Sequence, residues 1–317
     1  MENEFKKAKL LIDNSTNILL TMHERMDGDD GGSVLALAYE LERQKKTITV
    51  AIKKGVPPNL TFLPGSGRVL DDIAEGQKFD LLIVCGCSTL DRTGSRNIQN
   101  LTIPILNIDH HPDNALYGQV NLVDPKKSSV AELIFDLFNF CKWPIDKHLA
   151  TCLLTGIITD TGSFMHSNTQ ASTLKAAAKL LRKGAQVSQI IGQTFKGKTP
   201  QILKAWGHAL QNSYYDDKHK VIYAVITEQD LNELGQLPQS AFEGLAETLN
   251  TIPEAKFALF LRQEGSIIKG SLRSDPFKNA DVAKIARLFG GGGHKLAAGF
   301  SLAGKLSKDS SGKWKIE

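Results

Sequence analysis

The sequence contains few cysteines, no long apolar run and only a small excess of positive charge. Of its four cysteines, Cys85 and Cys87 are too close for an ordinary disulfide, and Cys141 and Cys152 show no extracellular disulfide framework. No apolar run reaches the roughly 18 residues that a membrane span needs, and the first residues lack the basic-then-apolar order of a signal peptide. We therefore expect a protein of the reducing cytoplasm that does not associate with membranes.

The charge and composition exclude some functions and leave others open. The 38 Lys and Arg against 34 Asp and Glu give a net charge of +4, which is too mild for a dedicated duplex-DNA binder but suits a small anionic substrate. With 41% hydrophobic and 23% charged residues, the chain falls in the range of folded globular proteins. Its 317 residues are enough for two domains. A folded enzyme or binding protein is the expected class.

Short apolar runs alternate with helical patterns in the first half of the chain. The runs that predict buried strands are residues 17–22, 47–53, 79–85 and 103–108, and a helix is predicted over 32–44. This alternation predicts an α/β fold with a mostly parallel sheet covered by helices. In such folds ligands gather at the carboxyl ends of the strands, so polar residues that directly follow a strand carry extra weight.

The remaining pattern predicts a second, smaller domain of mixed α/β type. Further helices are predicted over 129–140, 148–158, 169–183, 201–211, 241–249 and 280–288, and further strands over 221–227, 255–263 and 267–273. The breakers and charges of residues 195–200 are typical of a connector. We expect a first domain over 1–190, a connector over 191–215 and a second domain over 216–317.

Acidic and histidine side chains directly follow two of the predicted strands. His23, Asp27, Asp29 and Asp30 follow the first, and carboxylates this close repel one another unless a divalent ion absorbs their charge. The competing interpretation is a solvated acidic turn that caps the next helix. After the strand 103–108 comes Asp109-His110-His111, and histidine is the commonest side-chain metal ligand. Both clusters together favour a metal site at one edge of the sheet.

Four segments in order resemble the DHH phosphoesterase family with its DHH-associated C-terminal domain. They are His23…Asp27-Gly-Asp29, Asp109-His110-His111, Gly156-Ile-Ile-Thr-Asp160 and Gly290-Gly-Gly-Gly-His294-Lys-Leu-Ala-Ala-Gly299. The match covers nearly the whole chain, and the size resembles nano-RNases and pAp phosphatases. It implies two Mn²⁺ ions, with the following ligands: His23 and Asp27 for one ion, and Asp29, His110 and Asp160 for the other. It further implies that His111 faces the substrate phosphate and that Asp109 supports the histidines.

The resemblance also implies a substrate clamp in the second domain. Backbone N–H groups of a glycine loop with Gly292 and Gly293 would approach an anion, beside His294. The other implied contacts are Arg92 in the first domain and Ser271, Arg273 and Ser274 in the second. Arg273 suits bidentate phosphate capture. A simple flexible turn and an exposed structural arginine are the competing interpretations.

The implied activity is hydrolysis of RNA or DNA dinucleotides and short oligomers to mononucleotides, with removal of the 3′-phosphate of pAp as a further reaction. Linear or cyclic dinucleotide messengers are alternative substrates, and a homodimer is one option for the assembly. A protein that binds nucleotides without hydrolysing them is the alternative of a different class. Measured release of mononucleotides from a dinucleotide distinguishes the hydrolase from the protein that only binds.

One position departs from the family pattern at a central place. The family has an Asp that bridges both metals six residues before an Arg, and counting back from Arg92 leads to Gly86. The bridging ligand is then absent unless Cys85, Cys87, Asp91 or a water replaces it. An altered active enzyme, a binding-only relative and an enzyme with changed metal stoichiometry all remain open, and the substitution Gly86→Asp is expected to raise metal occupancy and turnover. Met26, Asp30 and Gly31 are milder departures.

Overall fold

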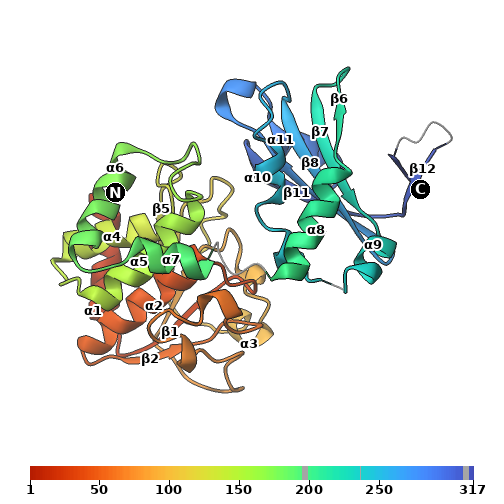
Figure 1. The fold of residues 1–317 in the computed structure, drawn as a ribbon. Helices are drawn as coiled ribbons and strands as arrows, with labels where there is room; N and C mark the ends of the chain where they lie inside the picture. Colours follow the sequence, from red (N-terminus) through yellow and green to blue (C-terminus); the bar gives the residue numbers. More distant parts are fainter. Residues whose placement is uncertain (195–198, 236, 310–313) are drawn as a thin grey trace. The chain divides into compact units, whose positions relative to one another are not determined.

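The computed structural model describes residues 1–194, 199–235, 237–309 and 314–317, and its contacts divide the chain into two compact units. The first unit runs from Met1 to Gly197 and the second from Lys198 to Glu317 (Figure 1). Most of the expected connector 191–215 is helical where it is described, and residues 195–198 of it lie outside the described residues. No helix in the described parts is both long and apolar enough to cross a membrane.

The first unit is built on a parallel sheet of five strands in the order β2-β1-β3-β4-β5. The strands are β1 (Asn17–Met22), β2 (Thr47–Val50), β3 (Leu81–Cys85), β4 (Ile105–Asp109) and β5 (Val120–Val123). The predicted parallel sheet is therefore confirmed, whereas β5 escaped prediction because only four residues with alternating burial form it. From β1 the chain continues to β2 on one side, and the next strand, β3, lies on the other side of β1. Ligands bind beside such a reversal of strand order.

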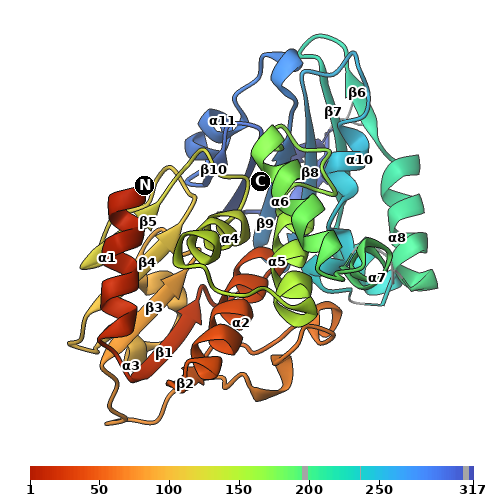
Figure 2. The ribbon, with the colours of Figure 1, turned by 90° about the vertical axis from the view of Figure 1, so that its left-hand side faces the viewer.

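Helices cover the sheet unequally on its two faces. They are α1 (Glu2–Asp13), α2 (Gly28–Arg43), α3 (Arg96–Gln99), α4 (Val130–Cys141), α5 (Lys147–Asp160), α6 (Ala171–Arg182) and α7 (Val187–Thr194). The main core joins Ile18, Leu20 and Met22 of β1 to buried side chains of α1, α2, α4 and α5, and Figure 2 shows α1, α2 and α4 in front of the strands. Leu19 faces the opposite side, in a smaller core with Ile98 of α3.

Glycines allow α2 and α5 to pack closely against each other. A Cβ on Gly32 would overlap the backbone carbonyl of Cys152, and one on Gly156 would overlap both Ala131 and the side chain of Asp29. Backbones this close leave no space for larger residues at these positions. The close approach holds the start of α2 beside the end of α5, where two of the candidate ligands lie.

The second unit contains a six-stranded mixed sheet in the order β10-β11-β9-β8-β7-β6, in which only β7 and β8 run parallel. Its strands are β6 (Tyr214–Asp216), β7 (Val221–Ile226), β8 (Phe257–Glu264), β9 (Ile267–Arg273), β10 (Gly292–His294) and β11 (Ala297–Ala303), and β12 (Leu306–Lys308) pairs with β13 (Trp314–Ile316). Its helices are α8 (Pro200–Gln211), α9 (Glu228–Glu233), α10 (Leu245–Leu249) and α11 (Val282–Leu288). This confirms the predicted smaller mixed α/β domain.

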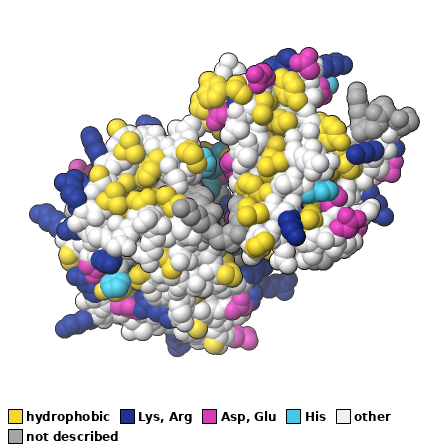
Figure 3. All heavy atoms as spheres, in the orientation of Figure 1, with side chains coloured by type: hydrophobic (Ala, Val, Ile, Leu, Met, Phe, Trp, Pro, Cys, Tyr) yellow, Lys and Arg dark blue, Asp and Glu magenta, His cyan; other side chains and the backbone are white. Residues whose placement is uncertain are grey.

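One face of the molecule agrees with the mild net charge. On the face drawn in Figure 3, Lys and Arg side chains are spread among other residues and do not form one large basic patch. This distribution differs from the continuous basic stripe that marks duplex nucleic-acid binders.

Candidate metal centre

The residues that follow the central strands emerge together at one edge of the first sheet. Met22 of β1 pairs with Cys85 of β3, and Cys85 pairs with Ile108 of β4. The next residue along each strand is His23, Gly86 and Asp109, respectively. The register therefore delivers the His23 and Asp109 segments to the same edge, with Gly86 between them.

The first cluster consists of His23, Asp27 and Asp30, whose ligand atoms lie within 4.8 Å of one another. His23 Nε2 lies 3.0 Å from Asp30 Oδ2 and 3.3 Å from Asp27 Oδ2. Asp27 also caps α2, because its Oδ1 accepts the backbone N–H of Asp30 at 2.9 Å. The helix-capping interpretation of this segment and the metal interpretation are thus compatible, since Asp27 caps through Oδ1 and faces His23 through Oδ2.

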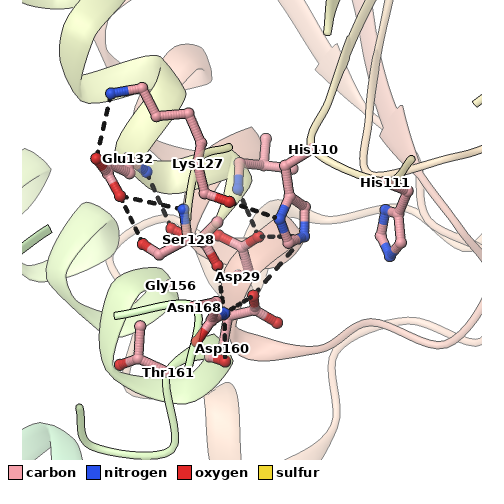
Figure 4. A network of polar contacts seen from close by, with 12 residues as sticks. Asp29, His110, His111, Lys127, Ser128, Glu132, Gly156, Asp160, Thr161 and Asn168 are labelled. Carbon is pink, nitrogen blue, oxygen red and sulfur yellow. Dashed lines mark hydrogen bonds and ion pairs between the residues drawn. The ribbon is translucent and has the colours of Figure 1, made fainter. Parts of the chain in front are cut away.

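The second cluster consists of Asp29, His110 and Asp160, again with ligand atoms within 4.8 Å of one another. His110 Nε2 lies 3.7 Å from Asp160 Oδ2 and 4.0 Å from Asp29 Oδ2 (Figure 4). The Nδ1 atom of the same ring lies 3.2 Å from the backbone carbonyl of Lys127. A proton on Nδ1 satisfies that carbonyl and directs the Nε2 lone pair toward the two carboxylates, the arrangement of a metal-binding histidine.

Asp29 is held by the start of α4. Its Oδ2 accepts the backbone N–H of Val130 at 2.7 Å, and its Oδ1 accepts that of Ala131 at 2.8 Å. These are the first N–H groups of the helix, which have no partner within the helix and favour negative charge. The side chain of Asp160, at the last residue of α5, accepts a hydrogen bond from Asn168 Nδ2 at 3.3 Å. Both carboxylates thus accept hydrogen bonds from backbone N–H groups or from a side-chain amide.

The electrostatics of the clusters call for a cation. Burial, together with the charges of neighbouring acids, raises the pKa of Asp29 well above its ordinary value and also raises that of Asp30. Burial raises the pKa of Asp160 to about 6. Burial disfavours a charged His23, but its hydrogen bonds to Asp27 and Asp30 prevail and raise its pKa to about 10. Acids that are this crowded and buried bind a divalent ion favourably, because the ion replaces their mutual repulsion with attraction. The donor set, imidazole nitrogen with carboxylate oxygen, fits such an ion.

Asp109 lies outside both clusters and organises His111. Its Oδ1 accepts the Nδ1–H of His111 at 2.6 Å and the backbone N–H of His110 at 2.7 Å, and its Oδ2 accepts Asn114 Nδ2 at 2.6 Å. Burial disfavours a charged His111, but Asp109 outweighs this and raises the pKa of the imidazole. His111 stands apart from the second cluster in Figure 4, with its ring about one-quarter exposed (24%). Arg92 is exposed, and its Nη1 lies 3.3 Å from Ser88 Oγ.

Position 86 has no free space for the Asp side chain that the family pattern has there. A Cβ on Gly86 would fall well inside 3.0 Å of Cγ and both oxygens of the Asp30 carboxylate, and the residue has a φ of +62° that L residues rarely adopt. The expectation that Gly86→Asp raises metal occupancy stays untested, and in this structure the single substitution would first require the Asp30 carboxylate to move. Cys85 and Cys87 are buried in the cores on opposite faces of the sheet, and burial raises the pKa of both thiols. Neither thiol is in a candidate metal cluster of the described residues.

The predicted clamp residues of the second unit have different environments. Arg273 Nε donates to Glu247 Oε1 at 2.6 Å, and its Nη1 donates to the carbonyl of Leu272 at 2.9 Å. Ser274 is buried, and its hydroxyl donates to the carbonyl of Lys256 at 2.7 Å, so this side chain makes a structural hydrogen bond. Ser271 is half-buried on β9. The expected glycine loop is in part a strand: β10, formed by Gly292, Gly293 and His294, pairs with β11 and is exposed.

Three contributors to the site were missed from the sequence. Asp30 belongs to the acids that follow the first strand but is not among the implied ligands, and its place beside His23, Asp27 and Gly86 is visible only in the structure. The carbonyl of Lys127 orients His110, and Asn168 bridges the carbonyl of Ser128 to Asp160 at 2.9 and 3.3 Å. These two contacts depend on loop conformation, which no motif in the chain encodes.

Comparisons with known proteins agree with this architecture. Residues 17–157 match the model of the DHH family, N-terminal domain, and residues 218–310 match the DHHA1 domain. The chain is 30% identical to the bifunctional oligoribonuclease and PAP phosphatase NrnA of Bacillus subtilis, over 95% of this chain and 93% of that protein. It is 28% identical to the protein of the same name from Thermus thermophilus, over 90% and 84%.

A solved structure is similar to this chain over most of its length. It is an exopolyphosphatase-related protein from Bacteroides fragilis, with a TM-score of 0.87 and 25% identity, covering 95% of this chain and 91% of that one. The agreement extends through both domains and does not depend on one motif. The chain belongs to the DHH family and carries a DHHA1 domain after its DHH domain.

Proposed function

We propose that this protein is a metal-dependent phosphoesterase that hydrolyses short oligonucleotides and dinucleotides to mononucleotides and removes the 3′-phosphate of pAp. The observation that carries the proposal is the pairing of two three-residue clusters of metal-ligand type at the carboxyl edge of one sheet. The names of the relatives, which are oligoribonucleases and PAP phosphatases, support the substrate class. DHH phosphoesterases depend on metals, and buried, crowded carboxylates are what such a dependence requires.

The proposed ligands are His23 and Asp27 for one cation and Asp29, His110 and Asp160 for the other. Mn²⁺ suits both clusters, because each mixes an imidazole nitrogen with carboxylate oxygens. When bound, two such cations activate a water and stabilise negative charge at the phosphorus centre. The chain itself orients the ligands: the Lys127 carbonyl fixes the tautomer of His110, and the start of α4 holds Asp29.

Asp109 and His111 are proposed to serve the substrate and not the metals. Asp109 accepts the Nδ1–H of His111, and a protonated ring also carries an Nε2–H, a group that can donate to a phosphate oxygen. The raised pKa of His111, for which Asp109 outweighs burial, keeps the ring cationic over a wider pH range than that of an ordinary histidine. Asn114 and the backbone N–H of His110 hold Asp109 in turn. Arg92 on the same unit is proposed as a further anion contact.

In the second unit, Arg273, Ser271 and the β10 segment with Gly292, Gly293 and His294 are proposed to bind the remainder of the nucleotide. Arg273 already pairs with Glu247, so a phosphate must compete with that carboxylate. The pair keeps the guanidinium oriented, which reduces the side-chain entropy lost on binding. Ser274 is proposed to support the turn after β9 through its bond to Lys256.

The test is Mn²⁺-dependent release of mononucleotides from a labelled dinucleotide, with binding of the same dinucleotide measured in parallel. We expect release that requires added Mn²⁺ and stops when a chelator removes it. A protein that binds the dinucleotide with Mn²⁺ present but releases no mononucleotide would instead be a nucleotide-binding protein. Assaying pAp in the same way tests the second proposed reaction.

A further inference from the structure

Asp30 and Gly86 form a complementary pair at the centre of the candidate metal site. Asp30 belongs to the first turn of α2, while Gly86 directly follows β3. A Cβ on Gly86 would fall on the Asp30 carboxylate, overlapping Cγ and both oxygens. The space that a side chain at position 86 would enter is thus filled by a carboxylate that reaches it from α2. Gly86 is the residue type that permits this, both by lacking a Cβ and by its positive φ.

One oxygen of this carboxylate has no hydrogen-bond partner. Asp30 is 2% exposed, and its Oδ2 lies 3.0 Å from His23 Nε2. Its Oδ1 is buried and has no partner among the described residues. Leaving a buried charged oxygen unpaired is costly, so such atoms in native proteins usually have a ligand or water. Glu132 in the same unit shows the contrast, because both of its buried carboxylate oxygens accept hydrogen bonds.

We propose that Asp30 supplies the metal-binding carboxylate that the DHH pattern places at position 86, so that the ligand has moved from the end of β3 to the start of α2. The inference rests on the proposed function, since it assumes that the two clusters bind cations. Asp30 binds through its unpaired Oδ1, beside His23 and Asp27. Gly86 then has a defined task, which is to leave the space that the relocated carboxylate occupies.

The other groups considered for this task lie elsewhere. Asp91 is exposed in the short 3-10 helix Leu90–Thr93, and no candidate metal cluster of the described residues includes it. Cys85 and Cys87 are buried among apolar side chains of the two cores. Asp30 alone combines burial, an unpaired oxygen and overlap with the position of a residue-86 side chain.

The experiment compares Mn²⁺ binding by the full chain in the parent and five variants, using calorimetry and the number of ions retained after dialysis. Asp30→Asn keeps the shape and removes the charge, so we expect Mn²⁺ affinity to fall by at least about 10–100-fold, the cost of losing even a residue that only supports a metal ligand, or one ion to be lost. Asp91→Asn is the matched control and should bind as the parent does. Gly86→Asp should gain no Mn²⁺ and should melt at a lower temperature, because its side chain meets Asp30. Asp30→Ala/Gly86→Asp returns the carboxylate to position 86 and should regain Mn²⁺ binding relative to Asp30→Ala.

The outcomes separate this inference from the proposed function. Equal Mn²⁺ binding by the parent and Asp30→Asn would overturn the inference while leaving a metal-dependent enzyme intact. A double variant that binds no better than Asp30→Ala would overturn the exchange between the two positions. A parent that binds no Mn²⁺ would overturn both proposals. Thermal melting of each variant without metal establishes that a loss of binding is not a loss of folding.

Discussion

The two units hold their charged candidate residues in opposite ways. In the first unit, Asp29 and Asp30 are 4% and 2% exposed and lie beside other acids. In the second unit, Arg273 is about one-third exposed and already bonded to Glu247. A buried acid beside other acids is unfavourable unless a cation is present, whereas a paired and partly exposed arginine is stable by itself. The first arrangement suits a bound cation, whereas in the second an anion would have to compete with Glu247 for the guanidinium.

This difference also predicts how each site responds to substitution. The acids of the first unit are linked through the helix starts and through one another, so removing one ligand changes the charge balance of all. The residues of the second unit act through separate contacts, and their effects should be smaller and nearly independent.

The largest effect is expected for the ligands of the second cluster. Asp29→Ala and His110→Ala should each lower Mn²⁺-dependent hydrolysis by more than about 100-fold, since even residues that only support a metal ligand cost 10–100-fold. The fold should persist, because neither side chain belongs to the apolar cores of the first unit. Steady-state hydrolysis of a dinucleotide and Mn²⁺ calorimetry measure the effect. His219→Ala, an exposed histidine of the second unit that pairs with Asp216, is the control. Unchanged Mn²⁺ binding in both variants would contradict the ligand assignment.

An intermediate effect is expected for the clamp. Arg273→Ala should weaken dinucleotide binding by about 1.5–3 kcal/mol, the usual cost of losing a charge-assisted hydrogen bond. Mn²⁺ affinity should stay the same, since the described metal clusters contain only residues of the first unit. Lys218→Ala removes an exposed charge from the same unit and serves as the control. Equal dinucleotide affinity in Arg273→Ala and the parent would show that the nucleotide binds elsewhere.

Periodicity and spacing predicted much of this molecule because they report on backbone geometry. The strand over residues 17–22 coincides with β1, and the apolar run 267–273 coincides with β9. The predicted helix over 241–249 is broken, because Gly244 adopts a φ of +90° and α10 begins only after it. Helix α1 was missed, since its buried face consists of only a few side chains on a strongly charged segment.

The candidate site was predictable only as far as single residues match a pattern. The placement of His110 beside Asp29 and Asp160 could be anticipated, since the three belong to ordered motifs. The relation between Asp30 and Gly86 could not be anticipated, because it arises where two segments that are distant in the sequence compete for the same space. A sequence pattern considers each position by itself, whereas the overlap between the Asp30 carboxylate and a Cβ at position 86 depends on both residues together.

The smallest effect is expected for Glu132, a buried acid of the first unit that differs from Asp29 and Asp30 by being fully bonded. Its Oε2 accepts the hydroxyls of Ser128 and Thr173 at 2.6 and 2.8 Å, and its Oε1 lies 3.2 Å from Lys127 Nζ. Glu132→Gln keeps the shape and loses the charge, so the free energy of unfolding should fall by about 1 kcal/mol at neutral pH. This network orders the 127–128 segment whose carbonyls contact His110 and Asn168.

The pH dependence of that effect distinguishes a bonded acid from a crowded one. Burial raises the pKa of Glu132, but the hydrogen bonds from Ser128 and Thr173 and the charge of Lys127 outweigh it, so the folded pKa lies below 4.5. The charged form is therefore stabilised by folding, and its contribution is complete above 4.5 and is lost as the pH falls through the folded pKa. In urea unfolding, the parent should have a higher free energy of unfolding than Glu132→Gln at about pH 7, and the two free energies should converge in acid. The control Glu42→Gln, a partly exposed acid paired with Arg68, should change stability by less than about 0.5 kcal/mol. A difference between the parent and Glu132→Gln that grows as the pH falls would show that Glu132 is destabilised by burial, as Asp29 is, and would remove the contrast between the two acids.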